Sequence, residues 1–214
     1  MEKNKIKHFY WLLWLCKIFA WPSWWIIYHR KYHYMEGAFK RLKLKGPGII
    51  VCNHNHWIEA PLITFTMPLR NICSVISDVV VSNKISRWFL NAIDTVIINK
   101  EKFELENFKK IINLLKNGQL ILIFPEGAMN GTKEIAPLKT GVATISYLAN
   151  VPIYPIYIHP HHKPFHPQHI ILGKKIVLYD HFKELNTITS SEMTKMLYDY
   201  LNLMKDTLES EINN

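Results

Sequence analysis

The sequence predicts an α/β domain in which a largely parallel central sheet is flanked by helices. Three observations carry this prediction. Short apolar runs typical of buried strands alternate with stretches at helical spacing. Two of these runs, 49–52 and 120–124, stop at abrupt polar breaks. The length of 214 residues fits one domain with a sizeable core.

The expected elements follow one another along the chain. Residues 36–46 alternate basic and apolar side chains, which predicts an edge strand. Its basic face could also touch anionic lipid, and a solvated strand face is the alternative. Further strands are expected at 49–52, 71–76, 95–98, 120–124, 151–158, 169–172 and 175–178. Helices are expected from Trp57 onward and at 82–92, 103–115 and 141–148, with a last one opened by a capping box at 189–192.

Residues 1–34 differ in composition from the rest of the chain. Three lysines precede an apolar stretch that holds five of the seven tryptophans, and a basic cluster closes it. Trp prefers the headgroup layer, and Lys17 and Pro22 disfavour a single spanning helix. We therefore expect 1–34 to form two short membrane-docking helices in one leaflet, and 35–214 to form the α/β domain. Packing of this segment against the domain is the alternative.

The formal net charge of +9 indicates anionic partners, among which nucleic acid, acidic lipid and phosphorylated substrates all fit. Aromatic platforms among Lys and Arg are lacking outside the N-terminus, so no nucleic-acid partner is expected. Cys16, Cys52 and Cys73 have no C-x-x-C spacing, which favours a reducing compartment. A reducing compartment and an aromatic N-terminus together predict that the protein is located at the cytoplasmic face of the cell membrane.

The first polar break, Asn53-His54-Asn55-His56, predicts a general base. His54 is expected where a buried strand ends and a helix begins, the edge at which open α/β sheets bind ligands. Glu59 in the first turns of that helix can reach back to the imidazole and fix its tautomer, leaving the other nitrogen free to take a proton. The acceptor substrate would supply the nucleophile. The alternative is a polar turn with incidental histidines.

The second polar break runs from Phe124 to Gly131. Pro125 and two glycines fix an unusual loop there, and Glu126 lies where this loop leaves the strand. A carboxylate there usually accepts from backbone N–H groups or ligand hydroxyls, and an exposed Glu in a hairpin-like loop is the alternative. Histidines at 159, 161, 162, 166 and 169 could hold zinc. Prolines among them indicate an extended loop without a regular element, so no metal site is expected.

Four short blocks together carry a family resemblance. Asn53-His54-x-x-x-x-Glu59, Ile97-Ile98-Asn99-Lys100, Phe124-Pro125-Glu126-Gly127 and Val151-Pro152-Ile153-Tyr154-Pro155 occur in the order and rough spacing of the motif blocks of glycerolipid acyltransferases, the family of bacterial 1-acyl-glycerol-3-phosphate acyltransferases. The resemblance spans about residues 48–180. The aromatic N-terminus also looks like the membrane-docking helix pair of that family.

The resemblance implies roles for individual residues. His54 would be the base and Glu59, where the family usually has Asp, would orient it. Lys100 stands at a phosphate-binding position that is usually Arg. The substrate-binding residues implied by the later blocks are Phe124, Pro125, Glu126 and Gly127, together with Pro152 near the acyl donor. Met129 stands where the third block usually has a further Arg, so Lys133 or Lys139 would have to supply that charge.

The implied activity is transfer of a fatty acyl group from acyl-CoA or acyl-ACP to the hydroxyl of a lysophosphatidate-like lysolipid in phospholipid biosynthesis. The thioester is a co-substrate, and neither a metal, another cofactor nor a covalent acyl-enzyme is needed. The replaced Arg leaves room for a non-phosphatidate acceptor such as a lyso-ornithine lipid or a glycolipid. A catalytically silent protein that binds lipid surfaces is the alternative from another class, and a nucleic-acid binder is a third.

Overall fold

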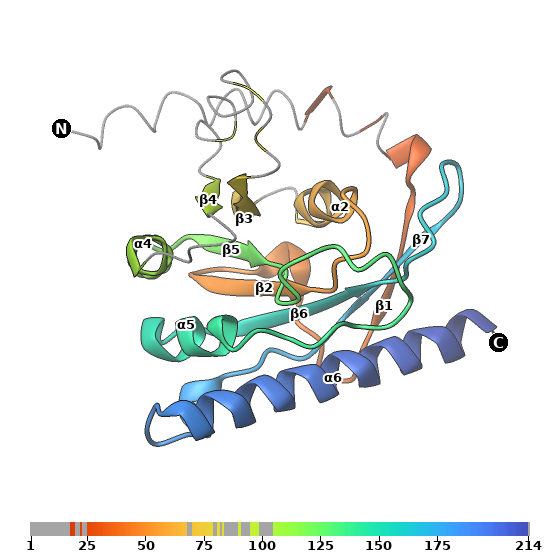
Figure 1. Cartoon of the computed structure of the whole chain (residues 1–214). Helices are drawn as coiled ribbons and strands as arrows, with labels where there is room; N and C mark the ends of the chain where they lie inside the picture. Colours follow the sequence, from red (N-terminus) through yellow and green to blue (C-terminus); the bar gives the residue numbers. More distant parts are fainter. Residues whose placement is uncertain are drawn as a thin grey trace.

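A seven-stranded sheet with helices on both faces forms the centre of the computed structural model (Figure 1). The structure describes residues 18–19, 22, 25–67, 70–78, 81, 83, 90, 95–98 and 105–213. The strand order across the sheet is β1-β7-β6-β2-β5-β3-β4. The strands are β1 (Arg30–Tyr34), β2 (Gly48–Cys52), β3 (Ile72–Ser77), β4 (Val96–Ile98), β5 (Leu120–Ile123), β6 (Ile153–Ile158) and β7 (Gln168–Leu172).

The sheet is mostly parallel, which confirms the predicted fold class. Strand β2 pairs in parallel with β5 on one side and with β6 on the other, and β3 pairs in parallel with both β5 and β4. The direction reverses once, where β6 meets β7, and β1 then runs parallel to β7. The carboxyl ends of β2, β5 and β6 consequently meet at one edge of the sheet.

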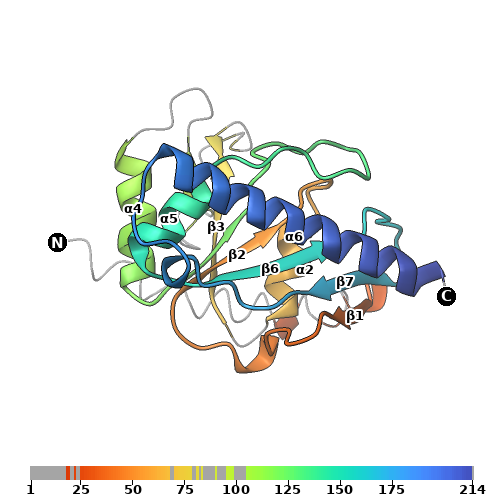
Figure 2. The same cartoon turned by 90° about the horizontal axis from the view of Figure 1, so that it is seen from below.

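Strand β2 is buried on both faces, which explains its uninterrupted apolar sequence. Ile50 and Cys52 face a cluster that includes Leu62 of α2 (Glu59–Thr66). Ile49 and Val51 face the opposite cluster, which is built with α4 (Leu105–Lys116), α5 (Gly141–Ala149) and α6 (Thr187–Asn213). Figure 2, viewed from below, shows α6 in front of the sheet, where it runs alongside β6 and β7 and contacts both strands.

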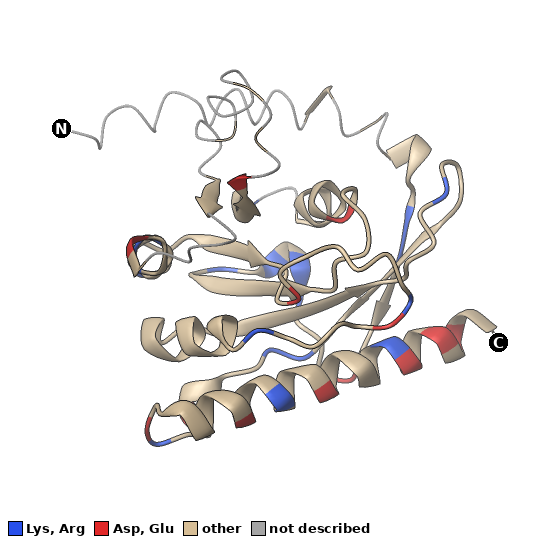
Figure 3. Cartoon of the chain, viewed as in Figure 1, with Lys and Arg blue, Asp and Glu red and all other residues tan. Residues whose placement is uncertain are grey.

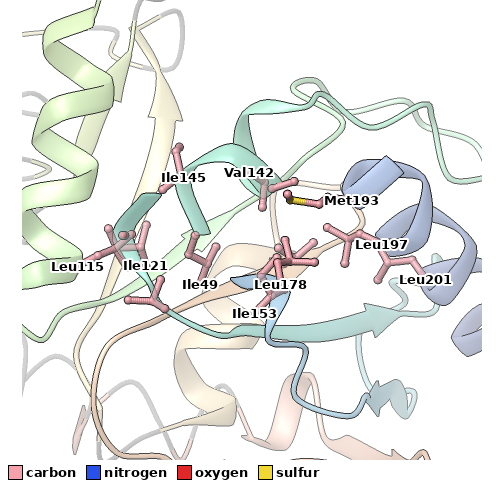
Figure 4. Packing of buried hydrophobic residues seen from close by; sticks show 14 of the residues in the cluster. Ile49, Leu115, Ile121, Val142, Ile145, Ile153, Leu178, Met193, Leu197 and Leu201 are labelled. Atoms are coloured by element: carbon pink, nitrogen blue, oxygen red, sulfur yellow. The ribbon is translucent and has the colours of Figure 1, made fainter. Parts of the chain in front are cut away.

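The larger core lies between the sheet and these three helices. In α4, Ile111 and Leu115 are the buried positions of an amphipathic helix whose other face is charged. Figure 4 shows the packed side chains of this core, among them Ile49, Leu115, Ile121, Val142, Ile145, Ile153, Met193 and Leu197. Acidic and basic residues are spaced along α6 (Figure 3). Its buried stripe includes Leu201 and Met204.

The capping box of α6 lies three residues before its predicted place. The N–H of Thr189 donates to Oδ1 of Asn186 over 2.9 Å, and the N–H of Asn186 donates to Oγ1 of Thr189 over 2.9 Å. Asn186 is therefore the N-cap residue, and Thr189 occupies the position in which the prediction had placed Glu192 of its box. The helix begins earlier than predicted because Asn caps as well as Thr does.

Three other predictions about secondary structure are wrong. Residues 36–46 contain a single 3-10 turn, η2 (Arg41–Lys43), in place of an edge strand. Residues 175–178 make one isolated bridge, between Ile153 and Ile176, and then enter η4 (Leu178–Asp180). Strand β1 occupies 30–34, the last residues of the segment predicted to dock on a membrane, so the sheet domain begins before residue 35.

The predicted helix pair of residues 1–34 falls largely outside the described residues, as does the helix predicted at 82–92, and both stay predictions. Large apolar side chains of the N-terminal residues that are described are exposed, namely Ile18, Phe19, Trp25 and Ile26. Within the described ranges, no helix combines the length and the apolar character needed to cross a membrane.

Candidate active site

The candidate site is built where β2, β5 and β6 end. Asn53 directly after β2 fixes this edge, because its side chain donates from Nδ2 to the carbonyl of Ile158 and accepts at Oδ1 from the N–H of Ile158, each over 2.9 Å. The two bonds extend the pairing of β2 with β6 by one side chain. His54 is thereby placed at the carboxyl edge of the sheet, as the sequence predicted.

His54 is held through its backbone and its ring. Its N–H donates to Oε1 of Glu126 over 2.7 Å, and its carbonyl accepts from the N–H of Asn130 over 3.1 Å. The imidazole stacks on the ring of Phe124 with centroids 3.9 Å apart. Nδ1 lies 3.0 Å from Oε2 of Glu59, and 19% of the side chain is exposed. Within the described part of the chain, Nε2 has no hydrogen-bond partner.

Glu59 begins α2 and is fully buried. Besides His54, it accepts from the N–H of Asn55, and Nε2 of His162 lies 3.2 Å from Oε1. Burial alone would raise the pKa of the Glu59 carboxyl, but the hydrogen bonds from His162 and His54 outweigh it, and the pKa lies below its ordinary value. The carboxylate is therefore ionised and fixes the Nδ1–H tautomer of His54.

The Phe-Pro-Glu-Gly stretch is a tight turn. The N–H of Gly127 donates to the carbonyl of Phe124 over 3.2 Å, with Pro125 at the second position, where its fixed φ fits. Gly127 has φ +75°, and a Cβ there would lie 2.6 Å from Cε and 2.8 Å from Nζ of Lys139. The glycine thus lets the Lys139 ammonium lie against the turn that carries Phe124. Lys139 also donates its backbone N–H to the carbonyl of Pro125.

Glu126 is a buried anchor of this loop. Oε1 accepts from the N–H of His54, while Oε2 accepts from Nδ2 of Asn130 over 2.7 Å and from the N–H of Ala136 over 2.9 Å. Burial raises the pKa of the Glu126 carboxyl above its ordinary value, and the negative charge of Glu59 adds to the rise. The alternative of an exposed Glu in a hairpin-like loop is wrong. Backbone N–H groups, one of the two kinds of donor expected for this carboxylate, bind it here.

The other predicted site residues lie apart from His54 or beyond the description. Lys100 is outside the described residues. Pro152 precedes β6, and its carbonyl accepts from the N–H of Ile49 at the start of β2. Since β2 separates it from His54 by five residues, roughly 16 Å, Pro152 lies at the opposite edge of the sheet. The thioester carbon that meets His54 therefore does not meet Pro152, and the role of Pro152 near another part of the acyl donor stays a prediction.

The structure adds two residues that sequence reasoning did not assign to the site, Asn130 and His162, and it places Lys139, one of the two lysines considered for the missing charge, against Gly127. Asn130 could have been found from its place before Gly131, because Asn in a turn often accepts from the backbone two residues on, as it does here from the N–H of Thr132 over 2.9 Å. His162 belongs to the histidine cluster considered for zinc, but its ring faces Glu59. Among the described residues, no three His, Cys, Asp or Glu side chains are grouped so as to hold a metal ion.

Comparisons with known proteins show the family of this chain. A family model described as Acyltransferase matches residues 10–159, which is more than half of the chain and includes both polar breaks. The chain belongs to the Acyltransferase family. Within this family it is similar to the 1-acyl-sn-glycerol-3-phosphate acyltransferase of Bacillus subtilis (strain 168), with 29% identity over 107 residues. That match covers 50% of this chain and about half of the curated relative's length, 53%.

The fold of this Acyltransferase member also matches a solved structure. The crystal structure of the 1-acyl-sn-glycerophosphate (LPA) acyltransferase, PlsC, from Thermotoga maritima superposes with a TM-score of 0.67. The superposition covers 100% of this chain and 85% of that chain at 16% sequence identity. At this identity the likeness shows the α/β fold with its mostly parallel sheet.

Proposed function

We propose that this chain transfers a fatty acyl group from an acyl-CoA or acyl-ACP thioester to the hydroxyl of a lysolipid of the lysophosphatidate type. The observation that carries the proposal is His54, whose Nδ1 is bound to a buried carboxylate while Nε2 is free among the described residues. A base that has an orienting acid and, in the part of the chain that the structure describes, no serine or threonine at its free nitrogen suits a reaction in which the acceptor itself is the nucleophile.

The proton route follows from this arrangement. The acceptor hydroxyl donates its proton to Nε2 of His54 as its oxygen attacks the thioester carbonyl. The tetrahedral intermediate collapses, the carbon–sulfur bond breaks, and the proton passes from His54 to the leaving thiolate. Backbone N–H groups at the sheet edge would stabilise the oxyanion, at about 3 kcal/mol per donor.

Cysteine chemistry does not compete with this route at β2. Burial, with the charges of Glu59 and Glu126, raises the pKa of the Cys52 thiol well above its ordinary value. The thiol is therefore neutral at physiological pH and a poor nucleophile. This supports direct transfer to the acceptor without a covalent acyl-enzyme.

Lys139 supports an anionic headgroup on the acceptor. Met129, at the position where the resembled family has Arg, is 55% exposed. Lys139 lies against Gly127, two residues before Met129, and its side chain makes no ion pair within the described residues. We propose that its ammonium contacts the acceptor phosphate in place of the missing guanidinium. A single ammonium cannot bind two phosphate oxygens as a fork, so weaker phosphate selectivity is expected.

The membrane surface is the proposed source of the acceptor. Trp57, three residues after His54, is 61% exposed, and Met129 is exposed at the same edge of the sheet. These two side chains give the site an apolar rim suited to a lipid interface, and the exposed apolar residues of the N-terminal segment add further apolar surface. We propose peripheral or monotopic binding at the cytoplasmic face of the cell membrane.

The proposal is tested by thiol release from acyl-CoA and acyl-ACP in detergent or vesicles. The acceptor panel contains lysophosphatidate, zwitterionic lysophospholipids, a lyso-ornithine lipid and a glycolipid. We expect transfer with preference for lysophosphatidate, and a loss of at least about 100-fold in His54→Ala. The matched control is His161→Ala, which removes an exposed imidazole from a neighbouring loop.

Two further readings make the result decisive. Vesicle flotation of His54→Ala should match that of the unaltered chain, and its cooperative thermal melting should show that the variant is folded. Transfer to none of the acceptors, or near-normal turnover by His54→Ala, contradicts the proposal. Unchanged vesicle binding without any thioester consumption would favour the silent lipid-binding alternative.

A further inference from the structure

A second histidine contacts the acid that orients His54. His162 lies between β6 and β7, and its Nε2 is 3.2 Å from Oε1 of Glu59, while His54 occupies Oε2. The His162 side chain is 5% exposed and Glu59 is fully buried. One buried carboxylate therefore carries an imidazole on each of its oxygens.

The other nitrogen of His162 also faces an acceptor. Nδ1 lies 3.1 Å from Oε1 of Gln168. The orientation of that amide is set by its own nitrogen, because Nε2 of Gln168 donates to the carbonyls of Lys163 and His166, each over 3.1 Å. A flipped amide would point its oxygen at two carbonyl oxygens, so Gln168 presents an acceptor to His162.

These contacts determine the protonation of His162. A neutral imidazole has one N–H, whereas both ring nitrogens here face oxygen acceptors, Gln168 on one side and ionised Glu59 on the other. Only the imidazolium donates to both. The loop thus places the buried His162 ring, with an acceptor at each nitrogen, beside the carboxylate that supports the base.

We propose that His162 is a positioning residue, held as an imidazolium, that shares the charge of Glu59 and thereby keeps His54 unprotonated and ready to accept a proton. This inference rests on the proposed function. The ionised Glu59 and the protonated His162 together carry no net charge. This pair still orients His54 through the Nδ1 bond, but it attracts a second proton to the His54 ring less strongly than Glu59 alone would. The hydroxyl proton taken by His54 then passes more readily to the leaving thiolate, and His162 stays protonated throughout.

Other titratable groups surround this pair and belong to the same electrostatic account. The ring of His56 lies 5.3 Å from that of His162, and His159 is close enough for the charge of His162 to act on it. The charge of Glu59 also raises the pKa of Glu126 and of the buried Cys52. The test therefore changes His162 alone and leaves these groups in place.

The kinetic test compares His162→Gln with His161→Gln across pH 5–9. Gln keeps an N–H donor near Glu59 but removes the charge, so the plateau of kcat/KM should stay within about fivefold of the unaltered chain. The acid limb should move to higher pH by about one unit, because Glu59 then favours protonation of His54 more strongly. His161→Gln, on the exposed neighbouring residue, should leave the limb in place. If the acid limb of the kcat/KM profile does not move in His162→Gln, the proposal is overturned. A loss of packing alone would lower the plateau and leave the acid limb at the same pH.

A second readout does not depend on activity. In nitrogen-15 spectra of histidine-labelled full chain, the ring signals lost in His162→Gln should show both nitrogens protonated at pH 7.5. A neutral ring at that pH overturns the inference even if the chain transfers acyl groups. A charged ring in a chain that transfers to no acceptor contradicts the proposed function and with it the role of His162 in proton transfer.

Discussion

Glu59 and Glu126 are two buried carboxylates at one edge of the sheet, yet they differ in what surrounds them. Glu59 receives hydrogen bonds from two imidazoles and the N–H of Asn55. Glu126 receives them from two backbone N–H groups and the amide of Asn130. The pKa of Glu59 is lowered and that of Glu126 is raised, although both side chains are buried.

The difference shows that burial alone does not assign a role to a carboxylate. Burial favours the protonated form in both cases, and the outcome depends on the donors that oppose it. Imidazole donors that can carry a positive charge favour the ionised form of Glu59. Neutral amide donors leave the pKa of Glu126 raised. Glu59 is thus suited to orient the base, and Glu126 to hold a loop together.

The largest expected effect is on catalysis by Glu59→Gln. The amide keeps the size of the side chain but removes the charge that fixes the tautomer of His54. We expect kcat to fall about 100-fold, which corresponds to about 2.7 kcal/mol of transition-state stabilisation. Thiol-release kinetics and thermal melting measure the two effects separately. If Glu59→Gln loses stability but keeps its turnover, Glu59 has a structural role like that of Glu126, and the proposed difference between the two carboxylates is wrong.

Glu126→Gln should affect stability more than chemistry. Whichever way the new amide turns, its NH₂ group faces at least one of the donors that Glu126 now accepts from, on His54, Asn130 and Ala136. We expect the free energy of unfolding to fall by about 1–3 kcal/mol, with kcat reduced less than in Glu59→Gln. Urea titration of both variants gives the comparison. A larger kcat loss in Glu126→Gln would contradict the division of roles.

The smallest effect is a contrast in the pH dependence of stability. Both carboxyls start from an ordinary pKa of 4.5. Since the folded pKa of Glu59 is lowered, its contribution is present above pH 4.5 and is lost as pH falls through the folded pKa. Since that of Glu126 is raised, its ionisation costs stability as pH rises from 4.5 through the folded pKa.

Unfolding free energies of each variant relative to the unaltered chain, measured between pH 3.5 and 7, should therefore change with pH in opposite directions for the two sites. Relative to the unaltered chain, Glu59→Gln should become less stable as pH rises, and Glu126→Gln more stable. Parallel profiles would show that the two carboxylates titrate alike, which the account does not allow.

The sequence predicted the sheet and the His54–Glu59 pair because both depend on short-range patterns. An apolar run followed by polar residues marks a strand end, and the five-residue spacing brings the acid back to the ring. The prediction for residues 36–46 failed because tertiary contacts decide their structure: Arg41 donates to the carbonyl of Thr66 and lies 4.0 Å from the centre of the Tyr32 ring.

Long-range placement was beyond sequence reasoning. The register of β6 against β2 puts Pro152 at the edge opposite His54, and nothing local encodes that register. The approach of His162 to Glu59 joins residues 103 positions apart through the loop that links β6 to β7. The position of Lys139 likewise depends on the left-handed conformation of Gly127 and on a backbone bond to Pro125.

We propose that Glu59 acts on the reaction through His54, and a double-mutant cycle measures this coupling. We would measure kcat/KM for the unaltered chain, His54→Ala, Glu59→Gln and the double variant with the best acceptor. If Glu59 works only by orienting His54, the double variant should be no slower than His54→Ala alone. Losses that multiply in the double variant would show that Glu59 acts independently of His54 and would contradict the account.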